Sequence, residues 1–69
     1  MQVSARNTLK ANVKNIVGGA VNTEVTLEIV PGIEVTAIIT KSSVEQLQLV
    51  EGKEAYVLIK SSDVMVAVD

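Results

Sequence analysis

Apolar and polar residues alternate along most of this chain, and this period of two constrains its fold more than any other feature. Within Val21–Val30, one face would carry Val, Thr, Val, Leu and Ile, and the other would carry Asn, Glu, Thr and Glu. Such alternation is typical of a half-buried β-strand, because successive side chains point to opposite faces of a sheet. Ile33–Thr40 resumes the alternation after Pro31-Gly32, a pair suited to the centre of a tight turn. The two stretches predict an antiparallel hairpin.

Three further stretches are predicted to be strands. Leu9–Val17 alternates until its phase changes near Asn15–Ile16, which indicates a bulge or a bend. Glu54–Ile59 is the fourth predicted strand. Val64–Val68 is the fifth, and it is apolar on both faces, so it would have to be covered on both sides. Turn-forming residues separate these stretches: Gly18-Gly19, Glu51-Gly52-Lys53 and Ser61-Ser62-Asp63.

One segment, Lys41–Leu47, breaks the alternation and predicts a helix of about two turns. Ser42 or Ser43 can serve as its N-cap, and Ser42 with Glu45 fits a capping box. The side chains expected to face the interior are Val44, Leu47 and Leu49.

The predicted order β-β-β-α-β-β places the helix between the third and fourth strands. This order predicts an all-β domain over residues 1–69: a small five-stranded OB-like barrel with one short helix. An SH3-like barrel is the alternative. No repeat or linker divides the chain.

The chain is short for a stable domain. A domain of 69 residues buries too little surface to be very stable without disulfides, a metal or a partner subunit. It has no Cys and no His, which excludes disulfides and makes a zinc site very unfavourable. Its hydrophobic fraction is nevertheless 48%. We therefore expect a homo-oligomer in which apolar surface faces another subunit.

Composition argues against several functions. A net charge of −2 and a single aromatic residue disfavour nucleic-acid binding, which uses basic surfaces and stacking platforms. No apolar run approaches the ~20 residues of a membrane span, and no signal-peptide core follows Met1, so we expect a cytoplasmic protein. The lack of His and Cys removes the commonest bases and nucleophiles. Glu24 and Glu28 share a polar strand face, which is typical of a solvated strand, and no enzyme activity is expected.

Two polar clusters stand out by position. Ser4–Thr8 precedes the first strand, and Lys60–Asp63 lies between the last two. Each offers a cation, hydroxyl donors and turn N–H groups, which together suit a small oxyanion. The alternative is that the serines only form turns and that the two cations are solvated.

The same clusters carry a family resemblance. Ser4–Lys10, followed much later by Ile59–Met65, resembles the molbindins, which are small molybdenum-pterin-binding-protein-like chains built on the Mop or TOBE domain. Val25–Ile29 and Ser43–Glu45 extend the resemblance over nearly the whole chain.

The resemblance implies a hexamer, built as a trimer of dimers, that holds molybdate or tungstate between subunits. It implies molybdenum storage or homeostasis without catalysis and without an organic cofactor. A second kind of site, near a threefold axis and made mainly of backbone donors, cannot be assigned to residues. The residues implied for the first kind of site are Ser4, Ala5, Arg6, Asn7, Lys60 and Ser61.

A site made only of donors suits molybdate, a tetrahedral dianion that carries no proton at neutral pH. Phosphate usually keeps a proton that needs an acceptor, and an unsatisfied buried group costs about 1–3 kcal/mol. Asp63 would weaken this selectivity against phosphate if it faced the anion, and we expect it to cap its own turn instead. The main alternative is a structural module that assembles but binds no ligand.

Overall fold

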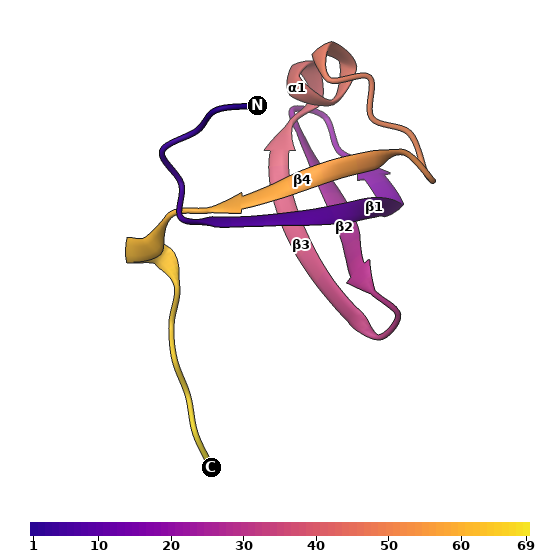
Figure 1. Ribbon diagram of the computed structural model, residues 1–69. Coiled ribbons are helices and arrows are strands. Elements are labelled where there is room, and N and C mark those ends of the chain that lie inside the picture. Colours follow the sequence, from indigo (N-terminus) through magenta and orange to yellow (C-terminus); the bar gives the residue numbers. More distant parts are fainter.

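The computed structural model describes all residues 1–69 (Figure 1). Four strands form one antiparallel sheet in the order β3-β2-β1-β4. The sheet curls into a half-barrel, which stays open because β3 and β4, its two edges, do not pair with each other. The elements are β1 (Asn7–Gly18), β2 (Asn22–Val30), β3 (Ile33–Thr40), helix α1 (Lys41–Gln46), β4 (Glu54–Ile59) and the 3₁₀ turn η1 (Ser61–Asp63).

The long strand β1 has a different partner along each half. Its first half pairs with β4, from Asn7 opposite Ile59 onward, and its second half pairs with β2. The register with β2 shifts between Val13 and Asn15, so Lys14 is the extra residue of a bulge. This agrees with the irregularity predicted near Asn15. A bulge bends a strand and increases its twist, which lets one strand serve both sides of a curved sheet.

The core is small and lies on the concave face of the half-barrel. The alternation in β2 is confirmed: Thr23, Val25 and Leu27 are buried, and the residues between them are exposed or half-buried. Partly buried side chains of β3 pack against this core. The buried apolar residues are Ala11, Val13, Val25, Leu27 and Val57.

The predicted hairpin is confirmed. β2 and β3 pair from Asn22 opposite Thr40 to Val30 opposite Ile33. Gly32 has φ +90°, which a residue with a side chain rarely adopts.

The helix is confirmed between β3 and β4, but its cap was predicted too late in the chain. Thr40 is the N-cap, and its Oγ1 accepts a hydrogen bond from the Ser43 N–H at 3.1 Å. The predicted N-caps Ser42 and Ser43 therefore lie within the first turn, and Glu45 does not complete a capping box. The helix begins earlier because Thr40, the last residue of β3, is extended and places its hydroxyl over the open N–H groups.

One of the three side chains expected to face the interior is largely exposed. Val44 and Leu49 pack against the core, but Leu47 is 59% exposed. The helix ends at Gln46 with Leu47 as C-cap, and Gln48 then adopts φ +53°. This left-handed residue redirects the chain so that Leu49 faces inward.

The predicted fifth strand is wrong for the single chain. Val64–Val68 forms no strand, and Val66 is 89% exposed. After η1 the tail runs away from the sheet (Figure 1), so no neighbouring strand can satisfy its backbone groups. The barrel of one chain therefore stays open. The only α-helix has six residues and cannot cross a membrane.

Thr40→Ala should lower the free energy of unfolding by about 1 kcal/mol, because the helix loses its side-chain cap. Ser42→Ala is the matched control, and it should cost less than about 0.5 kcal/mol at this exposed position. Urea unfolding at one fixed protein concentration measures both. An equal loss in the two variants would contradict the observed cap.

Candidate functional site

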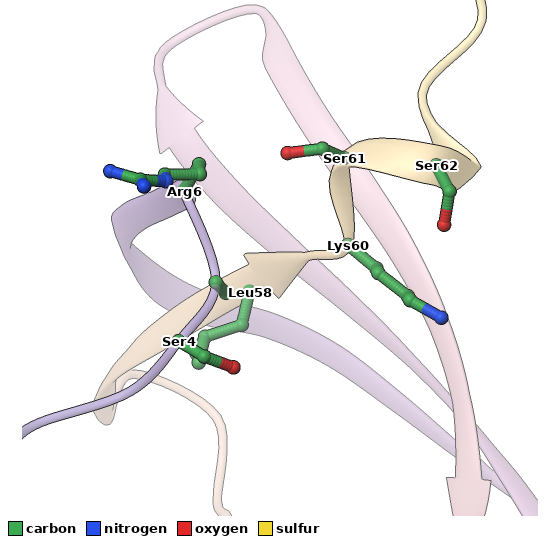
Figure 2. Close-up of a pocket in the computed structure, with 7 residues that line it drawn as sticks. Ser4, Arg6, Leu58, Lys60, Ser61 and Ser62 are labelled. Carbon is green, nitrogen blue, oxygen red and sulfur yellow. The ribbon is translucent and has the colours of Figure 1, made fainter.

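The two polar clusters meet at the end of the β1–β4 ladder. Asn7 and Ile59 form the last pair of this ladder, so Arg6 directly precedes it and Lys60 directly follows it. Around this point lies a surface hollow of about 610 Å³ (Figure 2). Its lining residues are Ser4, Ala5, Arg6, Leu58, Lys60, Ser61 and Ser62.

The sequence anticipated most of this lining. The residues singled out as site candidates all line the hollow except Asn7. Leu58 and Ser62 were missed as candidates. Ser62 belongs to the polar cluster that drew attention to Lys60 and Ser61, so its hydroxyl was a detectable signal, whereas nothing in the pattern marks Leu58.

Asn7 bonds to the protein instead. Its half-buried side-chain amide donates through Nδ2 to the Ile59 carbonyl oxygen at 3.2 Å. This bond joins residues 52 positions apart in the chain. It ties the beginning of β1 to the end of β4.

The two cations of one chain point away from each other. In Figure 2 the Arg6 guanidinium extends to one side of the hollow, and the Lys60 ammonium extends to the other. The Ser61 hydroxyl points toward the Arg6 side, whereas the Ser62 hydroxyl lies on the Lys60 side. A single chain thus presents two separate groups of donors.

The charged groups of this hollow are both positive and have no acidic partner. The ion pairs of the chain involve other lysines: Lys10 lies 3.5 Å from Glu54, and Lys14 contacts Glu28 and Glu34. Neither Arg6 nor Lys60 belongs to an ion pair. Their charges are therefore available to an anion from solution.

Lys14 shows the contrast on the outer face of the sheet. Its hydrogen bond and charge interaction with Glu34 raise its pKa above the ordinary value, and Glu28 adds to the effect. Lys14 is already neutralised by these two carboxylates, so it is a poor anion site.

The carboxylate nearest in sequence to the hollow, Asp63, is not part of its lining. The η1 turn is closed by backbone bonds, from the Asp63 N–H to the Lys60 carbonyl at 2.9 Å and from the Val64 N–H to the Ser61 carbonyl at 3.4 Å. The Asp63 side chain makes no hydrogen bond, so the expected side-chain cap is absent. The polar side chains of the lining are three hydroxyls and two cations.

This chemistry is that of binding rather than catalysis. Arg and Lys supply charge-assisted hydrogen bonds, and serine hydroxyls add directed donors without adding charge. The lining contains no His, Asp, Glu or Cys side chain, the groups that most often act as general bases or nucleophiles. The site can neutralise and orient a small anion.

A second hollow, of about 230 Å³, lies on the concave face of the half-barrel, and only apolar residues line it. It lies where a closed barrel would have packed side chains. The lining residues are Val25, Leu27, Ala37, Ile39, Leu47, Leu49, Ala55, Tyr56, Val57 and Leu58.

Comparisons with known proteins agree with the site's chemistry. The TOBE domain family matches residues 3–66. Molybdenum-pterin-binding protein 1 of Clostridium pasteurianum is 47% identical over 66 residues, which are 96% of this chain and 97% of that protein.

Solved structures show the same fold. A molybdate-binding protein from Sporomusa ovata superposes with a TM-score of 0.91 at 38% identity, over 99% of this chain and 100% of that one. The cytoplasmic molybdate-binding protein ModG, solved with molybdate bound, gives a TM-score of 0.89 at 46% identity, over 94% of this chain and 46% of that one.

Proposed function

The chain belongs to the TOBE-domain family and is a homologue of the molybdenum-pterin-binding (Mop) proteins, which are binding proteins and not enzymes, and from this premise we propose that it binds molybdate or tungstate as free oxyanions. The proposed ligand residues are Ser4, Ala5, Arg6, Lys60 and Ser61. Asn7 is not among them, because its side-chain amide donates to the Ile59 carbonyl instead.

One observation carries this proposal. Two unpaired cations and three serine hydroxyls surround one hollow that has no carboxylate in its lining. Four acceptor oxygens of a tetrahedral dianion can each take hydrogen bonds from such a set. A protonated anion would find no carboxylate in the lining to accept its O–H, and only the serine oxygens could do so.

We place the complete site between two subunits. Arg6 and Lys60 line the same hollow, but their charged ends point to opposite sides of it, so each could meet an anion together with a neighbouring copy. The anion would bridge the Arg6 side of one copy and the Lys60 side of another. Both motifs lie at strand ends, where a neighbouring copy can approach.

The same copy would complete the barrel. The tail Val64–Val68 is apolar and exposed, and it runs away from its own sheet, while the apolar hollow of the half-barrel stays uncovered. A strand contributed by a second copy would cover the hollow and pair with an open sheet edge. The assembly we propose is a hexamer, a trimer of dimers, and its closed barrels would be OB-like.

The cellular role we propose is molybdenum storage and homeostasis in the cytoplasm. Reversible binding without chemistry suits this role, because the oxyanion must be released unchanged. The second candidate is a structural module without a ligand, favoured only by the large exposed apolar surface. Elemental analysis separates the two, since molybdenum or tungsten should accompany the purified protein only if it binds the oxyanion.

Removing either cation should weaken molybdate binding by about 10- to 150-fold, because a charged hydrogen bond contributes about 1.5–3 kcal/mol. The variants are Arg6→Ala and Lys60→Ala, and Ser61→Ala should cost about fivefold. Equilibrium dialysis measures the dissociation constants. Lys10→Ala is the matched control, because Lys10 is an exposed cation outside the hollow. Unchanged affinity in both cation variants, with the oligomer intact, would contradict the site assignment.

The protein should bind molybdate and tungstate with similar affinity and phosphate hardly at all at neutral pH. The reason is that no carboxylate lines the hollow to accept the phosphate proton, while a serine that accepts it no longer donates to the anion, and an unsatisfied buried group costs about 1–3 kcal/mol. Calorimetric titration with each anion tests this selectivity. Phosphate competing on equal terms with molybdate would show that the site is not made of donors alone.

Val66→Asp should break the oligomer into smaller species, because a buried unpaired carboxylate is strongly unfavourable in an interface. The unchanged protein should be a stable oligomer at micromolar concentration without any ligand. Sedimentation equilibrium gives both masses, and Val30→Asp, at the far end of β2, serves as control. A folded monomer of the unchanged protein would refute the assembly.

A further inference from the structure

The residues of the N-terminal arm, 1–6, belong to no strand and pair with none. Yet this arm carries Ser4 and Arg6, which line the hollow. An anion site needs its donors held within a fraction of an ångström of their binding positions. Something must therefore fix the arm relative to Lys60 and Ser61.

The side chain of Asn7 meets this need. Its hydrogen bond to the Ile59 carbonyl, at 3.2 Å, is the one side-chain hydrogen bond that links the arm's end of β1 to β4. Ile59 packs against the core, so its carbonyl is the fixed end of this link. The two residues that flank the link in sequence are the cations Arg6 and Lys60.

No residue that lines the hollow makes a side-chain hydrogen bond of its own within the chain. Terminal pairs of a ladder open more easily than central ones. An added side-chain bond at the last pair opposes this opening. This bond lies directly beside Arg6, at the point where the N-terminal arm leaves the sheet.

We propose that Asn7 is a positioning residue of the oxyanion site: by binding the Ile59 carbonyl it holds the Ser4–Arg6 arm in place and does not touch the anion. The inference rests on the proposed function. The family resemblance implied that Asn7 is a direct ligand, and the inference gives it a supporting role instead.

A double-mutant cycle with Arg6 tests this role. Asn7→Ala should weaken molybdate binding about three- to tenfold in the unchanged protein. In the Arg6→Ala background it should cost less than about twofold, because its effect acts through the Arg6 arm and the two changes are not additive. Equilibrium dialysis with molybdate gives the affinities. Asn12→Ala is the control, since Asn12 is an exposed asparagine of β1 without a side-chain hydrogen bond.

Each other outcome overturns the inference in a recognisable way. An equal loss of affinity in both backgrounds would mean that Asn7 is a direct ligand. No loss of affinity in either background would mean that Asn7 only stabilises the pairing of β1 with β4. Asn7→Leu, which has a similar shape but cannot donate and adds no charge, replaces Asn7→Ala if that variant fails to assemble, and the same values are expected. Unchanged protein that binds no molybdate would instead overturn the proposed function, and this inference with it.

Discussion

The sharing of β1 between two neighbours is the constraint on which the rest of the molecule depends. Near Val13 the strand leaves β4 and continues along β2, and its backbone groups must stay satisfied through the change. The Val13 N–H donates to the Lys53 carbonyl at 2.9 Å, and the Val13 carbonyl accepts from the Gly52 N–H at 2.7 Å. The turn before β4 thus covers the bulge. Without this crossing, β4 would have no partner, and the two polar clusters would not meet.

The same crossing explains why one chain is unfinished. A curved sheet of four strands encloses a concave face but has no fifth strand to close it. Five buried apolar side chains make a small core for a chain in which apolar residues are nearly half. The exposed apolar side chains are spread over the strands, the loops and the tail, and the concave face also has an apolar hollow that one chain leaves uncovered. Subunit association, on this reading, is part of folding rather than an addition to it.

Most of the secondary structure could be predicted from the sequence because its signals are local. Ile33–Thr40 and Glu54–Ile59 were predicted with their observed bounds, since alternation and flanking turns depend only on neighbouring residues. The N-cap Thr40 was missed because Ser42 and Ser43, which follow it, are equally suitable cap residues by type. The tail was assigned to a strand because it is apolar on both faces and so needs to be buried. Composition cannot show whether the burying surface belongs to the same chain or to another one.

Predictability of the site divides in the same way. The two polar clusters and the family resemblance pointed to five of the seven residues that line the hollow and missed Leu58 and Ser62. The part played by Asn7 was not predictable, because the Asn7–Ile59 bond spans 52 residues and depends on the β1–β4 register. The opposite directions of Arg6 and Lys60 also emerge only once both strand ends are placed.

The exposure of the hollow in a single chain bears on both the proposed assembly and the proposed anion binding. Apart from half-buried Ala5, the residues that line the hollow are exposed in the single chain. Hydrogen bonds to an anion in contact with bulk water are weakened by competition and by salt screening. Enclosure by a neighbouring subunit lowers the local dielectric and strengthens the same donors without changing any residue. In the proposed assembly, the apolar excess that brings subunits together would therefore also strengthen anion binding, and a chain of this length could gain both by leaving its barrel open.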